Sequence, residues 1–356
     1  MKKMTAPLLL SAALIISACG TEENNENGNT NTDNQEANED TTGNNEAAED
    51  EEGAANNTEN NVSNEEQNDE DNETAGEFPV TITDNAGNEV TIDEEPETIV
   101  TLQPSDTEIL FEIGAGDRLV GVSEYCNYPE EALEIENVGA QDMDLERILS
   151  LEPDMALVSD YHASSHDDSL EQLRDAGIDV VVVRNAESFE GTYDTIETLG
   201  MLTGTEENAE ELIAEMESGM EELAELGETI DEEERKRVWV EVAPSPDIFT
   251  TGTGTFMHEM LETIGAENAA EEHEGWVNLT EEEIVTLEPD TIVTTYGYYV
   301  EDPQEEVMNR DGWSDVPAVA NEDVHDVQSD IVTRSGPRLV EGTRAVAEAV
   351  YPDVFE

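Results

Sequence analysis

The chain has 356 residues and carries 91 acidic against 13 basic side chains, a formal net charge of −78. A surface this acidic repels a polyanion, so we expect no nucleic-acid partner. The same self-repulsion destabilises a compact state unless counter-ions screen it, which predicts a halophilic protein that works in concentrated salt.

Residues 1–19 are typical of a bacterial lipoprotein signal peptide. Lys2 and Lys3 precede an apolar run, Ala6 to Ile16, that is too short to span a bilayer. Its ending, ISAC, resembles the lipobox, in which the cysteine becomes the lipid-bearing N-terminus. We therefore expect Cys19 to anchor the protein to the outer face of the cell membrane. An ordinary signal peptide, cleaved near an incidental cysteine, is the alternative.

Residues 20–76 differ in composition from everything that follows. This segment contains sixteen Asn and no Lys, Arg or aromatic residue, and with Glu77 it carries twenty acidic side chains. Such a composition cannot bury an apolar core. We interpret the segment as a disordered acidic tether that holds the folded part clear of a surface.

A repeat organises the remainder of the chain. The phrase LEPD occurs at 151–154 and again at 287–290, at an offset of 136 residues. Asp144 and Thr280, also 136 apart, are good N-caps, and Glu283 completes a capping box behind Thr280. Each helix must end before the proline of its LEPD, and an apolar strand follows. The order helix, proline turn, strand is therefore predicted twice.

A second echo supports duplication. Thr107–Val122 resembles His258–Ala270, and each reads as an amphipathic helix closed by glycine. Leu170–Val183 adds another helix, glycine and strand. Alternating buried strands and helices predict an α/β fold with two Rossmann-like lobes, each with a mainly parallel sheet, over 77–204 and 231–356.

One long helix is predicted between the lobes, over 205–230. It begins with a Thr cap and has apolar residues at helical spacing, namely Leu212, Met216, Met220 and Leu223. A single rigid helix between two lobes permits only modest hinge closure. A surface helix of a single domain is the alternative.

Signatures of catalysis are missing from the sequence. It contains no G-x-S-x-G, H-E-x-x-H, C-x-x-C or Walker loop, so we expect no enzyme, no metal site and no cofactor. His162 and His166 lie four apart, but Ser164 or Ser165 is the natural cap of the next helix, which places His162 in a solvated loop. Cys126 is expected to be a half-buried thiol without a role.

Aromatic side chains gather on loops that follow the predicted strands. These residues are Tyr125, Tyr128, Tyr161, Phe249, Trp276, Tyr296, Tyr298 and Tyr299. The loop "SDIVTRSGPR" adds Arg334 and Arg338. Ligands collect at such loops in doubly wound lobes, and two facing lobes form a cleft. Aromatic faces with an occasional guanidinium suit a large, flat, amphipathic ligand.

Four phrases in order resemble the Fe/B12 (class III) family of substrate-binding lipoproteins of ABC importers. They are "IVTLQPSDTEILFEIGAGDRLVGVSEYCNYPEEA", "LERILSLEPDMALV", "WVNLTEEEIVTLEPDTIV" and "RSGPRLVEG". The resemblance covers nearly all of Phe78 to Phe355, and EYCNYPEEA and GPRLVEG are most similar to the cobalamin-binding members. It implies two α/β lobes bridged by one long helix, in agreement with the interpretation above.

The resemblance also implies ligand-binding residues. The cleft tyrosine, the second-lobe tryptophan and the second-lobe arginine of cobalamin binders fall on Tyr125, Trp276 and Arg334. Two cleft tryptophans of a well-known cobalamin binder fall on Ala140 and Ser159. We expect Tyr161, Phe249 and Tyr296 to contribute further ligand contacts. A ferric siderophore or haem stays open as the ligand, and haem would need an axial Tyr or His.

Docking residues follow from the same resemblance. Members of the family dock on the permease through one glutamate on each lobe, and these fall on Glu146 and Glu282, again 136 apart. Both lie in the first turn of a helix, where the macrodipole favours a carboxylate in any case. The resemblance thus implies a monomeric, membrane-anchored, extracytoplasmic receptor that delivers cobalamin to an ABC permease with its ATPase. A surface enzyme and a structural wall protein are the alternatives from other classes.

Overall fold

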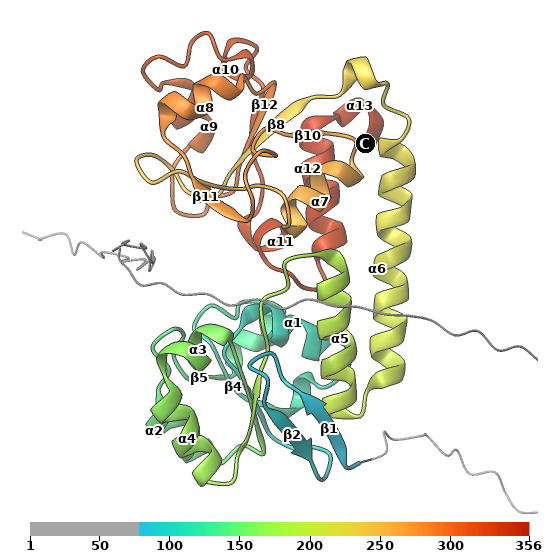
Figure 1. Ribbon diagram of the computed structural model, residues 1–356, viewed down its shortest axis with the longest axis vertical. Helices are drawn as coiled ribbons and strands as arrows, with labels where there is room; N and C mark the ends of the chain where they lie inside the picture. Colours follow the sequence, from blue (N-terminus) through green and yellow to red (C-terminus); the bar gives the residue numbers. More distant parts are fainter. Residues whose placement is uncertain (1–77, 356) are drawn as a thin grey trace, which may run out of the picture. The chain divides into compact units, whose positions relative to one another are not determined.

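The computed structural model describes residues 78–355 (Figure 1). The proposed signal peptide, the anchor Cys19 and the acidic tether lie outside the described residues, so these expectations stay predictions. Within 78–355, no helix combines the length and the apolar character that crossing a bilayer requires.

The first lobe is built on a five-stranded parallel sheet in the order β5-β4-β3-β6-β7. Its strands are β3 (Ile99–Thr101), β4 (Leu119–Val122), β5 (Glu136–Asn137), β6 (Met155–Val158) and β7 (Asp179–Val182), preceded by the antiparallel hairpin of β1 (Val80–Thr83) and β2 (Glu89–Ile92). Leu157 of β6 packs in the cluster that contains Ile109, whereas its neighbours Ala156 and Val158 pack in the cluster that contains Ile148. The strands are apolar on both faces because helices cover both faces.

The helices of this lobe follow the predicted alternation with strands. They are α1 (Pro104–Glu112), α2 (Leu145–Leu151), α3 (Asp160–Ser165), α4 (Asp167–Asp175) and α5 (Phe189–Thr203), with 3-10 turns η1 (Gly116–Arg118) and η2 (Glu130–Glu134). Gly114 and Gly177, which end α1 and α4, have positive φ, as the sequence indicates for helix-closing glycines.

The second lobe has a four-stranded parallel sheet in the order β10-β8-β12-β13 and a separate antiparallel pair, β9 with β11. The strands are β8 (Arg237–Glu241), β9 (Phe249–Thr251), β10 (Glu267–Asn268), β11 (Trp276–Asn278), β12 (Thr291–Thr294) and β13 (Val324–Asp326). The helical segments are η3 (Glu232–Glu234), α7 (Phe256–Thr263), α8 (Glu281–Leu287), α9 (Pro303–Met308), α10 (Pro317–Ala320), α11 (Ser329–Thr333), α12 (Leu339–Val350) and α13 (Pro352–Phe355). The predicted two-lobe α/β fold with parallel sheets is confirmed.

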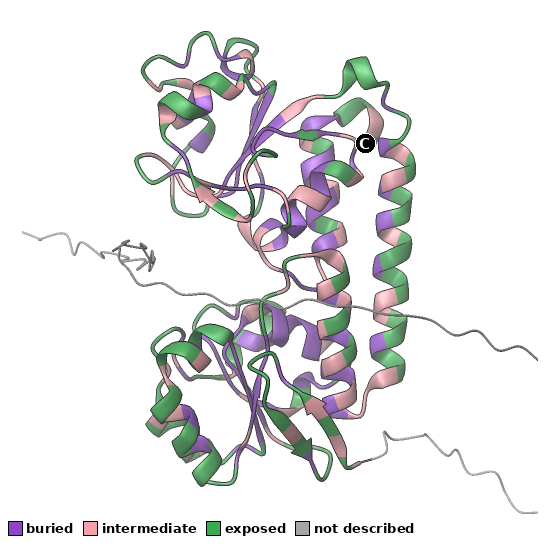
Figure 2. Ribbon diagram, in the orientation of Figure 1, coloured by how far each residue is buried: buried purple, intermediate pink, exposed green. Residues whose placement is uncertain are grey.

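The long connecting helix is α6 (Glu206–Gly227), as predicted. It packs against α5, α7, α12 and α13, and its buried Met216, Met220 and Leu223 join the cluster that extends into both lobes. Its outer face is exposed (Figure 2). The connector is thus held along its length by helices from each lobe, which makes it stiffer than an isolated helix.

The two LEPD segments lie in equivalent local structures. The Asp144 side chain accepts a hydrogen bond from the Arg147 N–H at the start of α2, and Thr280 forms the predicted capping box at the start of α8. Both helices end at the glutamate of the motif, Glu152 and Glu288, each with φ of 48°. The duplicated helix, turn and strand are therefore confirmed.

The aspartate of each LEPD has the same structural role in both lobes. Asp154 Oδ2 accepts a hydrogen bond of 2.9 Å from the N–H of Thr98, just before β3. Asp290 Oδ2 accepts one of 3.0 Å from the N–H of Arg237, the first residue of β8. β3 pairs with β6, and β8 pairs with β12. In both lobes the aspartate therefore ties the helix-turn-strand unit to the neighbouring strand.

Candidate ligand-binding cleft

A cavity of about 630 Å³ lies between the lobes. The first lobe contributes loops that follow β3, β6 and β7, and the second lobe contributes the start of α7, β11 and the segment after α11. The lining residues include Ser105, Asp160, Arg184, Glu187, Phe256, Trp276 and Arg334. The cavity thus lies at the carboxyl ends of parallel strands in the first lobe, where ligands bind in doubly wound folds.

Four of the expected ligand residues lie at or next to this cavity. Trp276 and Arg334 line it, and the Trp276 side chain is 49% exposed. Tyr161 is 43% exposed and directly follows the lining residue Asp160. Tyr125 is 59% exposed, and its carbonyl oxygen accepts a hydrogen bond from Arg334. Phe249 is half-buried in β9 and does not line the cavity.

The expectation that Tyr296 contacts the ligand is wrong. Its side chain is 0% exposed, and its hydroxyl donates a hydrogen bond of 2.7 Å to Glu241 Oε1. Burial and the Glu241 carboxylate raise the pKa of Tyr296 far above its usual value. The neighbouring Tyr298 and Tyr299 are the exposed side chains of this loop.

A buried ion pair in the second lobe accounts for the position of Tyr296. Glu241, at the end of β8, accepts hydrogen bonds from Arg310 Nη1 at 2.9 Å and Nη2 at 2.5 Å. The Trp239 indole N–H donates to the same carboxylate, and the Arg310 guanidinium lies 4.7 Å from the Trp313 ring centroid. The carboxylate thus fixes the loop that follows β12.

The expectation that His162 lies in a solvated loop is also wrong. Ser159 caps an additional short helix, α3, which contains Ser164 and Ser165, and His166 rather than either serine precedes α4. His162 therefore occupies the third position of α3, with 3% exposure. Its Nδ1 lies 2.7 Å from Ser159 Oγ and its Nε2 lies 2.8 Å from the Ala140 carbonyl oxygen. Burial lowers the pKa of His162. The histidine therefore has a structural role in the first lobe.

Two further polar groups are buried beneath the cleft in the first lobe. Cys126 is fully buried rather than half-buried, and its Sγ lies 3.1 Å from Thr107 Oγ1. Burial raises the pKa of this thiol, which lowers its reactivity. Asp106 is also buried, and burial raises its pKa to about 7 despite hydrogen bonds from Gln103 and Ser105.

Within 78–355, no group of three or more His, Cys, Asp or Glu side chains is arranged to hold a metal ion.

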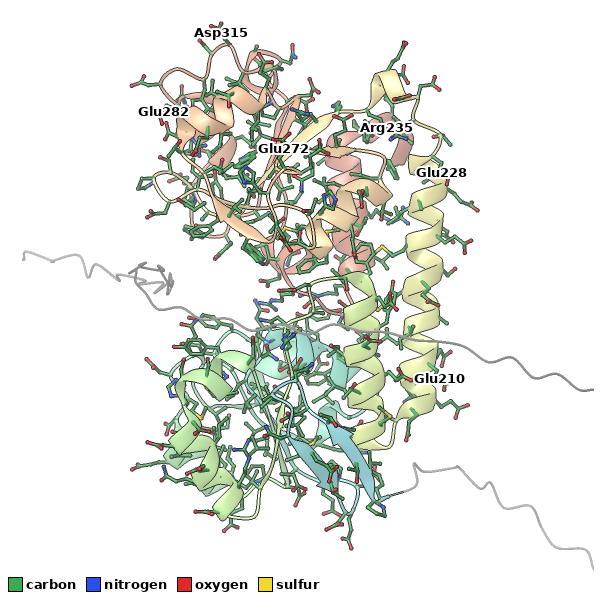
Figure 3. All side chains as sticks on the ribbon, viewed as in Figure 1. Glu210, Glu228, Arg235, Glu272, Glu282 and Asp315 are labelled. Atoms are coloured by element: carbon green, nitrogen blue, oxygen red, sulfur yellow. The ribbon has the colours of Figure 1, made fainter. Side chains whose placement is uncertain are left out.

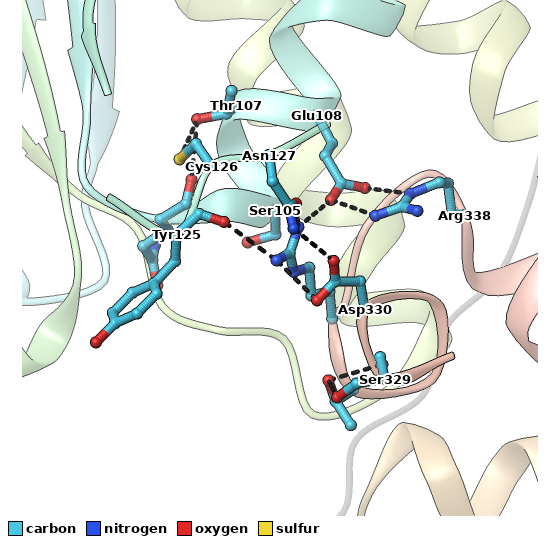
Figure 4. Close-up of polar contacts among 12 residues, drawn as sticks. Ser105, Thr107, Glu108, Tyr125, Cys126, Asn127, Ser329, Asp330 and Arg338 are labelled. Carbon is cyan, nitrogen blue, oxygen red and sulfur yellow. Dashed lines mark hydrogen bonds and ion pairs between the residues drawn. The ribbon is translucent and has the colours of Figure 1, made fainter. Parts of the chain in front are cut away.

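Ion pairs link the two lobes next to the cavity (Figure 4). Glu108 of α1 is 1% exposed, and its carboxylate accepts from two arginines of the second lobe. Arg334 Nη1 lies 2.8 Å from Oε1, while Arg338 Nη2 and Nε lie 2.8 Å and 2.9 Å from Oε1 and Oε2. We call Glu108, Arg334 and Arg338, together with Asp330, the interlobe clasp.

The clasp occupies both terminal nitrogens of Arg334. Nη1 also donates to Asn127 Oδ1 at 2.9 Å, and Nη2 donates to the Tyr125 carbonyl oxygen at 3.1 Å and to Asp330 Oδ1 at 2.9 Å. Two carboxylates balance two guanidiniums, so the clasp is neutral overall. A ligand contact through these nitrogens would have to replace a protein partner.

The expected docking residues occupy matching positions. Glu146 and Glu282 are exposed in the first turns of α2 and α8. Glu282 points away from the second lobe, at its outer edge (Figure 3). The structure therefore leaves both carboxylates accessible to a partner.

Sequence reasoning missed several residues of the cleft. Ser105, Asp160, Arg184 and Phe256 line the cavity without having been singled out. Arg184 could have been found, because it lies two residues after the buried strand "DVVV" and basic residues are scarce in this chain. Glu108 could not, because its partners lie more than 220 residues away.

A cleft between two α/β lobes joined by one long helix defines the class of two-lobe ligand receptors. Residues 99–331 match the periplasmic binding protein family. The chain is 46% identical over 279 residues to the uncharacterized ABC transporter substrate-binding lipoprotein YvrC of Bacillus subtilis (strain 168), covering 78% of this chain and 88% of that protein.

Two further similarities bear on the ligand. The chain is 30% identical over 295 residues to a cobalamin-binding protein of Halobacterium salinarum (strain ATCC 29341 / DSM 671 / R1), covering 79% of this chain and 76% of that protein. It also resembles the crystal structure of a possible iron-binding (periplasmic solute-binding) protein from Staphylococcus epidermidis ATCC 12228. That similarity has a TM-score of 0.64 and 32% identity, and it covers 72% of this chain and 100% of the other.

The chain therefore belongs to the periplasmic binding protein family. It is the substrate-binding component of an ABC transporter, and it binds its substrate without catalysing a reaction.

Proposed function

We propose that this protein captures a cobalamin-type corrinoid outside the cell membrane and delivers it to an ABC permease. The cavity, lined by Trp276 and flanked by exposed tyrosines of the first lobe, carries this proposal. Its volume of about 630 Å³ lies within the range of small-molecule binding sites. A corrin ring is flat and amphipathic, and aromatic side chains stack on such surfaces.

The charge of the cavity supports the same ligand. In a chain with a net charge of −78, the charged lining residues are two acids and two arginines, Asp160, Glu187, Arg184 and Arg334. The two acids repel a ligand with several negative charges, such as haem or a tris-catecholate siderophore. A corrinoid carries mainly neutral amides. The similarity to a cobalamin-binding protein points in the same direction.

A ferric siderophore or haem is the second candidate ligand. The similarity to a possible iron-binding protein favours it. Haem iron would need an axial tyrosine or histidine, and the exposed Tyr125 and Tyr161 each adjoin a residue that lines the cavity.

A fluorescence titration tests the ligand. Trp239 and Trp313 are buried, so Trp276 is the tryptophan that a ligand in the cleft would quench. We expect cyanocobalamin to quench the emission of the wild type and to leave the emission of Trp276→Phe nearly unchanged. Calorimetry on both proteins shows whether Trp276→Phe has lost affinity for the ligand or only the fluorescence signal. A wild type that ignores cobalamin and binds ferric enterobactin, ferrichrome or haem would favour the second candidate.

Glu146 and Glu282 are proposed to dock on permease arginines. Replacing both by Ala should abolish corrinoid uptake and leave the affinity for the ligand unchanged, because the two carboxylates lie outside the cavity. A matched control replaces Glu210, an exposed glutamate near the start of α6, and Glu228, the exposed residue that follows its end (Figure 3). Uptake that survives the first pair of substitutions would rule out the docking role.

Two further parts of the proposal concern the cell and its medium. A lipid on Cys19 would anchor the monomer, so Cys19→Ser should release it from the membrane fraction into the medium. The α6 helix bears nine glutamates and no basic residue, which favours folding in concentrated salt. A circular dichroism spectrum with the full helical signal of the folded protein in very dilute buffer would contradict the prediction that the protein is halophilic.

A further inference from the structure

Basic side chains are scarce in this molecule, and the ion pairs of the described residues show which of them have no carboxylate partner there. Eleven basic residues follow residue 77. Within 78–355, seven of them lie within 4.0 Å of a carboxylate: Arg118, Arg147, Lys236, Arg237, Arg310, Arg334 and Arg338. The remaining four, Arg174, Arg184, Arg235 and Arg344, form no ion pair with a described residue. In so acidic a chain, an unpaired arginine calls for an explanation.

Arg184 is the one of these four that lines the interlobe cavity. It lies two residues after the end of β7, and its N–H donates a hydrogen bond of 3.1 Å to Asn85 Oδ1. The N–H of Asn85 in turn donates to the Val182 carbonyl oxygen at 3.0 Å. The backbone of Arg184 is thus held in place, while its side chain is exposed.

The second cavity arginine, Arg334, is engaged differently. Its Nη1 donates to Glu108 and Asn127, and its Nη2 donates to Tyr125 and Asp330. The positive charge of Arg334 is thereby compensated within the clasp. Among the described residues that line the cavity, Arg184 supplies the uncompensated positive charge.

We infer that Arg184 is a specificity-determining residue that pairs with a single anionic group on the ligand. Asp160 and Glu187 line the same cavity and repel additional negative charge. The inference rests on the proposed function: a cobalamin carries one phosphodiester, in the loop that joins the corrin to its nucleotide base. The guanidinium forms charge-assisted, bidentate hydrogen bonds with phosphate oxygens.

The test compares two corrinoids on two proteins. Cobinamide lacks the nucleotide loop and its phosphodiester, whereas cyanocobalamin has both. We expect Arg184→Gln to weaken cyanocobalamin binding by about ten- to a hundredfold, the range for a hydrogen bond to a charged group, and to leave cobinamide binding unchanged. Calorimetry measures both affinities. Arg184→Lys, which keeps the charge, should restore part of the cyanocobalamin affinity.

Controls separate this effect from a loss of structure. Arg174→Gln removes an unpaired arginine at the end of α4 that does not line the cavity, and it should change neither affinity. The difference between wild type and Arg184→Gln should shrink in concentrated salt, because screening weakens exposed charge pairs.

The possible outcomes distinguish a failure of the inference about Arg184 from a failure of the proposed function. If the wild type binds cyanocobalamin and Arg184→Gln binds it equally well, the inference fails and the proposed function stands. An equal loss for both corrinoids also overturns the inference, since Arg184 would then not recognise the phosphodiester. A wild type that binds no corrinoid overturns both.

Discussion

The two lobes are alike where they support the fold and different where they face the ligand. Both contain a capped helix, a turn that ends in a left-handed glutamate, a buried strand and an aspartate that holds the neighbouring strand. At the cleft, the first lobe contributes the buried acid Glu108 and the second contributes the two arginines that pair with it. The duplication thus preserves the framework, and the loops beyond the strands have diverged.

The largest effect is expected at the buried ion pair between Glu241 and Arg310 in the second lobe. Replacing Glu241 by Ala removes the buried partner of Arg310 and leaves it only the partly exposed Glu306, which should lower the free energy of unfolding by up to about 3–5 kcal/mol. Thermal or denaturant unfolding measures the loss. Replacing both Glu241 and Arg310 by Met should cost much less, because both buried charges are removed and Glu306, which then loses Arg310, is partly exposed. Equal losses for the single and double variants would contradict this account.

The next largest effect is expected at the interlobe clasp. Glu108→Gln removes the negative charge that both Arg334 and Arg338 contact. We therefore expect the lobes to separate and the distribution of distances between labels on the two lobes to broaden. Spin labels at positions 171 and 305, exposed on α4 and α9, report that distance after Cys19 is replaced. The control is Glu136→Gln, which removes an exposed pair with Arg147 inside the first lobe. Unchanged distances between the labels in Glu108→Gln would show that the long helix, and not the clasp, sets the angle between the two lobes.

Asp106 should make the first lobe sensitive to pH. Because burial raises its pKa from 3.8 to about 7, folding favours the protonated form. Its contribution to stability is fully present below pH 4 and is lost as the pH rises through 7, by up to about 1.4 kcal/mol per pH unit. Asp106→Asn should remove this part of the pH dependence and be more stable than the wild type at pH 8. Parallel curves of unfolding temperature against pH would argue against it.

The smallest effect tests the equivalence of the two repeats directly. Glu152 and Glu288 both have φ of 48°, a conformation that costs most residues about 1–2 kcal/mol and glycine little. Each substitution to Gly should raise the free energy of unfolding by up to about 1 kcal/mol, and by the same amount in both lobes. Chemical denaturation of the two single variants measures the gains. Unequal gains would show that the turns differ more than their backbones suggest.

The sequence predicts the repeated framework well because its signals are local. Asp144, Thr280 and the two prolines set helix limits within a few residues, so the helices and strands of both repeats agree with expectation. The short helix α3 was missed because Ser164 and Ser165 are good caps for the helix that follows, whereas both lie inside α3 and Ser159 is its cap. A carbonyl oxygen 22 residues away, that of Ala140, accepts from His162 and favours Ser159.

The cleft is less predictable because contacts distant in sequence decide which side chains face it. Tyr296 follows a strand as Tyr161 does, yet Glu241, 55 residues earlier, draws its hydroxyl into the interior. Arg334 lies at the cavity as the family resemblance implies, but its engagement by Glu108 depends on how the lobes meet. Aromatic and basic residues on strand-end loops therefore identify the region of the site, and only the packed structure identifies which atoms are free.

Every contact of the interlobe clasp joins one protein group to another, so holding the lobes together requires no cargo. If Glu146 and Glu282 are the docking points, their separation is then nearly the same in empty and loaded receptors. An empty receptor would compete with a loaded one for the same transporter. Import should consequently slow when the cell makes far more receptor than the supply of substrate can fill.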